Sequence, residues 1–132
     1  MSKQPEFTFA HTGLNVKDRD ATAAWYEKNL NMRIVRSVPG AMHFLADPTG
    51  RVILEIYSNE SAPMLDLGAT HFLTLHLAVL TETPKETEAQ LQKAGAVTVD
   101  PYKITGAGDE LIMMRDPFGL GLQLIKRKEP MF

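Results

Sequence analysis

Hydrophobic and polar positions follow one order along the chain, and that order occurs twice. Short runs of β-branched and aromatic residues predict strands, and apolar residues recurring every three or four positions predict helices. In the first half we expect a strand over 7–16, a helix from Asp18 or Asp20 to Leu30, and strands over 32–38, 41–47 and 51–57. In the second half we expect a strand over 71–81, a helix from Thr83 to Ala94, and strands over 97–104, 110–115 and 120–126. The repeated order predicts two βαβββ modules.

The turns and helix ends repeat as well. Segments 47–50 and 116–119 both read Asp-Pro-x-Gly, a form typical of β-turns. Asn31 and Gly95, which tolerate the left-handed conformation, follow the two helices. Thr83, Pro84 and Glu86 predict a capping box at the start of the second helix. Corresponding markers lie about 65 residues apart, which indicates an internal repeat.

The fold class that this pattern predicts is α+β. Each module is expected to form a curved, mostly antiparallel sheet with its helix on the convex side, and the two concave faces to enclose a central cavity. A chain of 132 residues predicts a single domain, with module one over about 7–58, a linker over 59–70 and module two over about 71–127. Trp25 and Tyr26, on the first helix, are predicted to lie in the core.

Composition changes this picture mainly by exclusion. A hydrophobic content of 44%, a charged content of 23% and a net charge of -2 are ordinary for a globular protein and favour no nucleic acid or anionic membrane as partner. The chain has no apolar run that could span a membrane and no apolar leader, so we expect a cytoplasmic protein. It has no cysteine, so a metal site must use His, carboxylate or amide oxygen ligands.

Four polar side chains occupy matching places in the two halves. His11 and His76 open the first strand of each half, and Glu55 and Gln123 lie between apolar neighbours in the last strand. A carboxylate in an apolar strand is costly to bury unless it is paired or bound to a metal. Two imidazoles, one carboxylate and one amide oxygen can bind a divalent first-row metal and leave room for a substrate. These four residues are therefore the predicted metal ligands.

The other two histidines fit this pattern less well. His71 precedes His76 by an odd number of residues, so the two would point to opposite faces of a regular strand. Counting back from Leu91 and Gly95 selects His76 as the counterpart of His11. His43 lies in a middle strand without a partner in the second half, and we expect it to be structural or to line a pocket wall. Because a lone strand histidine is most often structural, the metal prediction depends on the repeat.

The sequence resembles the vicinal oxygen chelate superfamily, which includes glyoxalase I, fosfomycin-resistance enzymes, methylmalonyl-CoA epimerase, extradiol dioxygenases and bleomycin-resistance proteins. The resemblance spans nearly the whole chain and is carried by His11-Thr12-Gly13-Leu14-Asn15-Val16, Trp25-Tyr26, Leu30-Asn31-Met32, Leu54-Glu55-Ile56, His76-Leu77-Ala78-Val79, Leu91, Gly95 and residues 116–124. It implies paired βαβββ modules, one metal ligand at each of the four positions, a small-molecule substrate and, commonly, a homodimer. Gln123 departs from the more frequent glutamate of the last strand, which leaves Glu55 as the acid at the metal.

Three functions follow from this resemblance. The leading expectation is a metal-dependent lyase or isomerase of the glyoxalase I type, in which Zn, Ni, Mn or Fe stabilises an enediolate of a small oxygenated substrate and Glu55 is the general base. The second is a non-catalytic, bleomycin-resistance-like binding protein whose groove would include aromatic residues such as Phe44 and Tyr57. The third is an Fe(II) extradiol-type dioxygenase with a His11, His76 and Glu55 triad. The sequence decides neither the substrate nor the metal.

Overall fold

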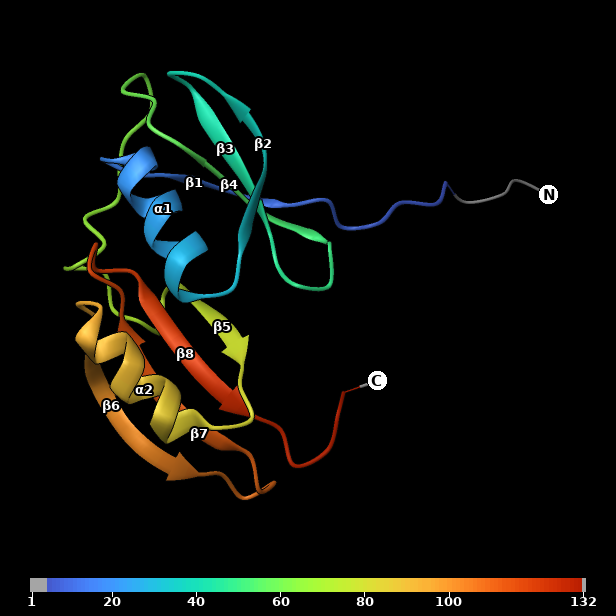
Figure 1. Cartoon of the computed structure of the whole chain (residues 1–132), viewed down its shortest axis with the longest axis vertical. Helices are drawn as coiled ribbons and strands as arrows, with labels where there is room; N and C mark the ends of the chain where they lie inside the picture. Colours follow the sequence, from blue (N-terminus) through green and yellow to red (C-terminus); the bar gives the residue numbers. More distant parts are fainter. Residues whose placement is uncertain (1–4, 132) are drawn as a thin grey trace. The chain divides into compact units, whose positions relative to one another are not determined.

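The computed structural model describes residues 5–131, apart from the side chain of Val52, and places ten helices and strands within them. In chain order they are β1 (Thr12–Asn15), α1 (Arg19–Asn29), β2 (Arg33–Val38), β3 (Met42–Ala46), β4 (Val52–Tyr57), β5 (His76–Leu80), α2 (Pro84–Lys93), β6 (Val97–Ile104), β7 (Glu110–Arg115) and β8 (Gly121–Lys126) (Figure 1). The chain divides into two compact units, with the boundary between Met64 and Leu65. None of the helices described is long and apolar enough to span a membrane.

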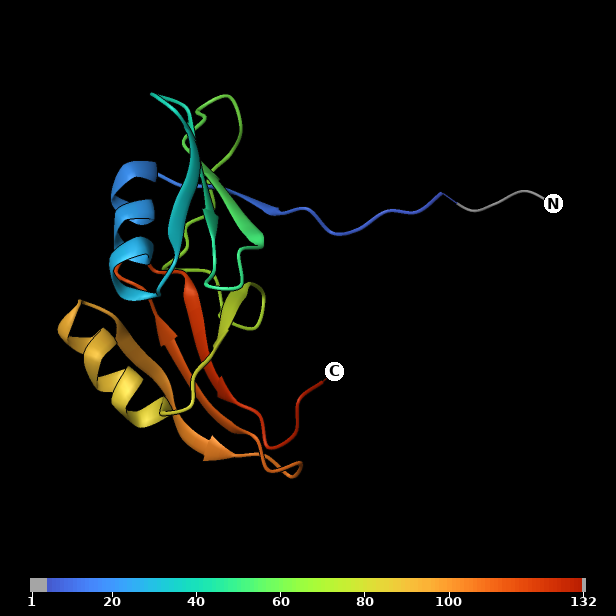
Figure 2. The same ribbon diagram turned by 45° about the vertical axis from the view of Figure 1, so that its right-hand side comes forward.

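Each unit is one βαβββ module, as the sequence pattern predicts. The first sheet has the strand order β1-β4-β3-β2 and the second β5-β8-β7-β6. In each sheet the first strand of the module runs parallel to the last, and the other pairs are antiparallel. Each sheet is therefore mixed, and each helix lies against one face of the sheet of its own unit (Figure 2).

The helix-covered face of each sheet forms the core of its unit. Because alternate strand residues point to opposite faces, Leu54 and Ile56 are buried beneath α1, together with Leu45 and Tyr26. Tyr26 is a core residue as predicted, whereas Trp25 is only partly buried. In the second unit the equivalent buried residues are Ile112, Met114, Leu122, Leu124 and Leu91. Because of this alternation, Glu55 and Gln123 each lie on the face of their own sheet that the helix does not cover.

The two helices begin differently. Asp18 is the N-cap of α1, and its carboxylate accepts a hydrogen bond of 2.9 Å from the backbone N–H of Ala21. The capping box predicted for α2 is wrong, because the Thr83 side chain makes no capping hydrogen bond. The Thr83 backbone N–H instead donates to the hydroxyl of Thr81 at 3.2 Å. The Thr81 hydroxyl, which lies before the helix, thus accepts a hydrogen bond from the backbone of the residue that precedes α2.

Both helices end in the left-handed conformation, as predicted. Asn31 has φ 53° and Gly95 has φ 102°. After α2, the N–H groups of Gly95 and Ala96 donate to the carbonyls of Gln92 and Leu91 at 3.1 and 3.0 Å. These two bonds are the pair that closes a helix in a Schellman motif.

The first strand of each module is shorter than predicted. β1 begins at Thr12 rather than at residue 7, and β5 begins at His76 rather than at residue 71. For β5 the reason is the extent of the partner strand, because His76 pairs with Gly121, where β8 begins. β4 begins at Val52, two residues before the partner of Thr12, so in this register it ends before it could pair with residues 7–9. Residues 7–11 belong to no strand, and Phe7 and Phe9 are 91% and 73% exposed.

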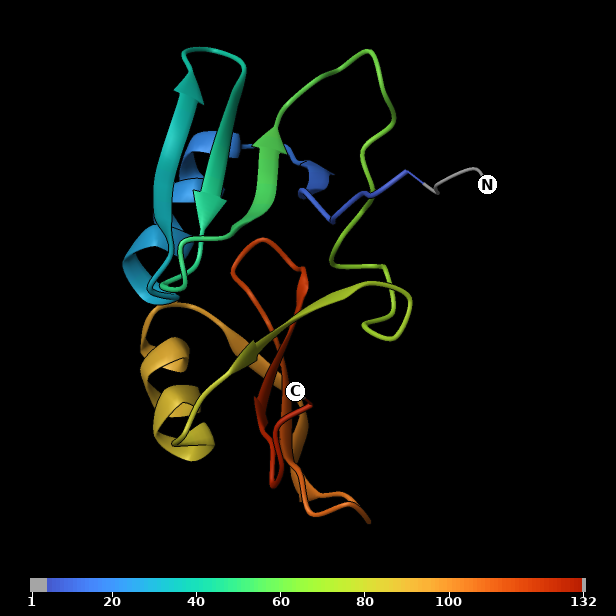
Figure 3. The ribbon, with the colours of Figure 1, turned by 90° about the vertical axis from the view of Figure 1, so that its right-hand side faces the viewer.

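The segment predicted as a linker runs between β4 and β5 (Figure 3), and hydrogen bonds hold both of its ends. In the first unit, the Asn15 side chain exchanges two hydrogen bonds with the backbone of Asn59, at 2.8 and 2.9 Å. In the second unit, the Arg115 guanidinium donates to the carbonyls of Leu67 and Thr70 at 2.9 and 3.0 Å. The flanks of the linker thus belong to the two units, on either side of the boundary at Met64.

Candidate metal centre

His11 and Glu55 lie together in the first unit. His11 directly precedes β1, and Glu55 lies in β4 opposite Gly13. The His11 Nε2 atom is 3.8 Å from the Glu55 Oε1 atom, which is too long for a hydrogen bond. Two donor atoms held at about 2.1 Å from one tetrahedral ion lie about 3.4 Å apart. The pair therefore needs to close by only a few tenths of an ångström to share a metal.

The surroundings of this pair hold it in place without using its donor atoms. The His11 ring lies edge-on to the Phe44 ring, with centroids 5.3 Å apart and planes at 84°. The His11 and Glu55 side chains are 36% and 20% exposed. Apart from their mutual contact, neither makes a polar contact with another side chain in the described part of the chain. Both donors remain available to a ligand.

His76 and Gln123 form the equivalent pair in the second unit. His76 opens β5 opposite Gly121, and Gln123 lies in β8 opposite Ala78, so both side chains lie on the same face of the sheet. The His76 Nδ1 atom donates to the carbonyl of Phe72 at 2.8 Å. This bond places the proton of a neutral imidazole on Nδ1 and leaves the lone pair on Nε2, which is the usual arrangement of a metal-binding histidine.

The register makes the two pairs equivalent. In each unit the last-strand donor lies opposite the residue two positions after the histidine, since Gly13 pairs with Glu55 and Ala78 pairs with Gln123. This local correspondence agrees with the repeat in the sequence. Within neither unit do three His, Asp or Glu side chains among residues 5–131 come together as a metal-binding group. A shared ion for all four residues stays a prediction.

One residue that sequence reasoning missed supports His76. A methyl group on Gly121 would lie 2.9 Å from the Cβ atom of His76 and 3.1 Å from that of Phe72. Only glycine therefore lets the turn before β5 approach β8 this closely. The signal was present, because an isolated glycine in a strand pattern often marks a close backbone approach.

His71 is not part of this arrangement. Residues 72–75 form a turn, and the Thr74 N–H donates to the His71 carbonyl at 2.9 Å. The Nδ1 atom of His71 accepts a hydrogen bond of 3.0 Å from the Leu73 N–H. The premise that His71 and His76 share a regular strand is therefore wrong, although His76 is the histidine placed on β5.

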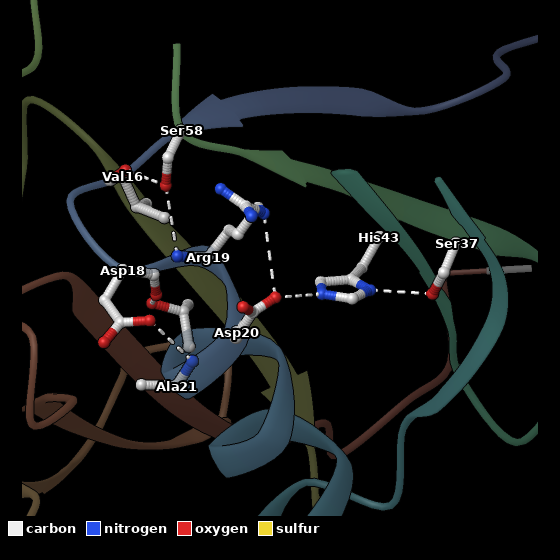
Figure 4. A network of polar contacts seen from close by, with 9 residues as sticks. Val16, Asp18, Arg19, Asp20, Ala21, Ser37, His43 and Ser58 are labelled. Carbon is white, nitrogen blue, oxygen red and sulfur yellow. Dashed lines mark hydrogen bonds and ion pairs between the residues drawn. The ribbon is translucent and has the colours of Figure 1, made fainter. Parts of the chain in front are cut away.

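His43 lies in a polar network that ties α1 to the sheet (Figure 4). Its Nε2 atom is 2.6 Å from the Asp20 carboxylate, and its Nδ1 atom is 2.7 Å from the Ser37 hydroxyl. The hydrogen bond with His43 lowers the pKa of the Asp20 carboxyl below its ordinary value. The network lies on the helix side of the sheet, where His43 is opposite the buried Ile56. These contacts fit the structural role expected for His43.

The comparison with known sequences adds the reaction type of two plant relatives. Lactoylglutathione lyase GLX1 of Arabidopsis thaliana is 28% identical over 133 residues, which cover 95% of this chain and 46% of that protein. A Brassica oleracea var. gemmifera protein, provisionally named a lactoylglutathione lyase, is 29% identical with the same coverage. The chain thus spans about half the length of the curated relatives it matches.

The solved structures agree on the fold. A glyoxalase-related enzyme from Fulvimarina pelagi superposes with a TM-score of 0.69 at 18% identity, covering 91% of this chain and 88% of that one. The bleomycin resistance determinant encoded on transposon Tn5 superposes with a TM-score of 0.63 at 24% identity, covering 93% and 100%. The family model of the Glyoxalase/Bleomycin resistance protein/Dioxygenase superfamily matches residues 8–124. Because this match runs through both modules and includes all four candidate ligands, the chain belongs to that superfamily.

Proposed function

We propose that this protein is a metal-dependent lyase or isomerase of the glyoxalase I type that acts on a small oxygenated substrate. The observation that carries the proposal is the His11–Glu55 pair, 3.8 Å apart and with donor atoms that no other described side chain uses. The similarity to lactoylglutathione lyases supports the reaction type. In this proposal His11, Glu55, His76 and Gln123 are the ligands of one divalent ion.

The donor chemistry fits such an ion. Two imidazole nitrogens, one carboxylate and one amide oxygen suit Zn, Ni, Mn or Fe(II), and the lone pair on the His76 Nε2 atom is free to bind. A bound divalent ion would draw electron density from two adjacent substrate oxygens and so acidify the neighbouring C–H group. The fold supplies the histidine orientation without the ion, through the Phe72 carbonyl.

Glu55 is the residue proposed to move the proton. It is the one carboxylate among the four donors, because Gln123 cannot accept a proton at neutral pH. Glu55 would take the proton from the hydroxyl-bearing carbon beside a carbonyl and return it to the former carbonyl carbon, while the hydroxyl hydrogen passes to the oxygen of that carbon. The first carbon becomes the carbonyl, so the net reaction is an isomerisation with no loss of atoms. One carboxylate would perform both transfers. General-base catalysis of this kind contributes about 10²–10⁴ in rate.

Metal analysis and activity separate the two roles of these residues. The purified protein is expected to hold about one equivalent of Zn, Ni, Mn or Fe by elemental analysis, and His11→Ala and His76→Ala to lose it. Glu55→Gln keeps an oxygen donor and is expected to retain metal, while turnover of 2-oxoaldehyde–thiol adducts falls by about 10²-fold or more. Full activity of Glu55→Gln on every substrate of the parent protein would refute the assignment of the base.

A second candidate function is non-catalytic binding, as in bleomycin-resistance proteins. The observation that favours it is the amide at position 123, which leaves the second module without an acid at this place. If the protein binds no metal after reconstitution and its thermal midpoint does not respond to Zn, Ni, Mn or Fe(II), binding replaces catalysis. We also propose a homodimer, which light scattering at micromolar concentration would contradict by detecting a monomer.

A further inference from the structure

The face of the first sheet that carries Glu55 also carries a row of cross-strand neighbours. Gly13 pairs with Glu55, Glu55 with Phe44, and Phe44 with Arg36, so one row crosses β1, β4, β3 and β2. Paired residues point to the same face. Since adjacent strands lie about 4.8 Å apart, the Arg36 backbone is about 10 Å from that of Glu55. Phe44 lies between them.

A groove in the first unit covers the Phe44 and Arg36 end of this row. It has a volume of about 680 Å³, and its walls include Phe9, His11, Phe44, Arg36 and Arg51. Small-molecule sites occupy about 300–1,000 Å³ and combine apolar walls with a few polar groups. The groove therefore has the size and the mixed lining that a small ligand requires, and His11 connects it to the candidate metal centre.

The charge of the groove is positive and uncompensated at the Arg36 end. The Arg36 and Arg51 guanidinium groups form no ion pair or hydrogen bond with any described side chain. None of the described residues that line the groove is acidic, and Glu55, in the same cross-strand row, contacts His11 at 3.8 Å. Two free guanidinium groups favour a planar anion, because their N–H groups match the two oxygens of a carboxylate.

We propose that this groove binds a small carboxylate with an apolar or aromatic body, held by Arg36 and Arg51 and packed on Phe44. The reacting end of such a ligand would lie toward His11 and Glu55, so this part of the inference rests on the proposed function. The anion site itself does not. Together, the anion site and the metal centre would select small organic acids in which a short apolar spacer separates the carboxylate from the reacting oxygens.

The experiment uses the full chain without metal and compares two probes of the same shape. Phenylacetate and its neutral amide, phenylacetamide, are titrated in the presence of EDTA, and binding is followed by the backbone amide signals in NMR. We expect phenylacetate to bind at least tenfold more tightly, with the largest shifts around residues 35–36, 44 and 51. Because the contact is between charges, its affinity is expected to fall as salt increases.

Single substitutions test the two arginines. Arg36→Ala and Arg51→Ala are each expected to weaken phenylacetate binding at least fivefold. Arg33→Ala is the matched control, because Arg33 is an exposed arginine of the same strand that does not line the groove. It is expected to change binding less than twofold. Arg36→Lys keeps the charge but loses the paired N–H groups, and an intermediate loss is expected.

The outcomes separate this inference from the proposed function. Equal binding of the acid and the amide, no binding of either, or unchanged affinity in Arg36→Ala and Arg51→Ala would each overturn the anion site. Glu55→Gln is expected to bind phenylacetate as well as the parent protein or better, since it removes a negative charge. If the protein binds phenylacetate but no metal, the anion site is supported and the metal centre is refuted. If it binds metal but not phenylacetate, the metal centre is supported and the anion site is refuted.

Discussion

At the scale of single residues, Gly121 determines how closely His76 lies against the sheet. Its missing side chain leaves room for the Cβ atoms of His76 and Phe72, which would lie 2.9 and 3.1 Å from an added methyl group. His76 and Phe72 are also joined by the hydrogen bond from the His76 Nδ1 atom to the Phe72 carbonyl. A larger residue at position 121 would therefore have to displace the backbone that carries His76 and Phe72.

Replacing this glycine tests that close approach. Gly121→Ala is expected to destabilise the protein by about 1–3 kcal/mol, because backbone and side-chain atoms must shift to admit the methyl group. Urea unfolding measures the loss. Gly106→Ala is the control, since no atom lies within 4 Å of the position of an added methyl group there. Equal stabilities of the two variants would contradict this account.

A second prediction at this scale concerns Asp20. The hydrogen bond with His43 lowers the folded-state pKa of the Asp20 carboxyl below its ordinary value of 3.8. A lowered pKa stabilises the folded protein above pH 3.8, and this contribution is lost as the pH falls through the folded-state value. Urea midpoints are expected to be lower for Asp20→Asn than for the parent at pH 7, and the difference to shrink below pH 4. A difference that grows on acidification would be the wrong sign.

Some residue roles were readable from the sequence and others were not. His11, Glu55, His76 and Gln123 stand out because the repeat places them in register. The sequence did not reveal which ring nitrogen of a neutral His76 carries the proton. That depends on the carbonyl of Phe72, in a turn that the sequence pattern predicted to be a strand. The partners of His43 were also missed, since Asp20 comes from a helix whose position over the sheet is set by packing.

At the scale of elements, the two helices offer a comparison of N-caps. The Asp18 carboxylate accepts a hydrogen bond at the start of α1, whereas the Thr83 side chain makes none at the start of α2. Asp18→Ala is expected to destabilise the protein by about 1 kcal/mol, and Thr83→Ala by less than about 0.5 kcal/mol. Thermal and urea unfolding of the two variants measure the contrast. A larger loss in Thr83→Ala would indicate that its hydroxyl does cap the helix.

The strands show where an element's own sequence is insufficient. Residues 7–11 alternate in a way that favours a strand, and so does part of 71–75. Neither forms one. β8 begins level with His76, and β4 begins level with residue 10, so residues 71–75 and 7–9 have no partner in these strands. The other strand boundaries agree with prediction to within one residue, since turns at Pro39-Gly40 and at the two Asp-Pro-x-Gly segments fix them locally. The length of the first strand of each module therefore also depends on the strand with which it pairs.

At the scale of the whole chain, Arg115 anchors the segment that leads into the second unit. It donates to the carbonyls of Leu67, Thr70 and Gly119 at 2.9, 3.0 and 2.7 Å. Arg115→Ala leaves these carbonyls without that donor, and we expect chymotrypsin to cleave after Leu67 several-fold faster. Arg127→Ala is the control, because it removes a contact to Asp109 in the same unit. Unchanged cleavage after Leu67 in Arg115→Ala would mean that the segment is held by other contacts.

The parallel pairing of first and last strands has a consequence for how such a chain can evolve. In each module it brings a histidine and its partner donor side by side from opposite ends of the module, whatever the length of chain that connects them. The hairpins between them can gain or lose residues over generations without separating the two side chains, and the connection is longer in the second module than in the first. Each module can also change the side chain at this place of its last strand, as the carboxylate at position 55 and the amide at position 123 illustrate. An internal repeat of this kind can thus carry different side chains at equivalent places of its two copies, with the same pairing in each.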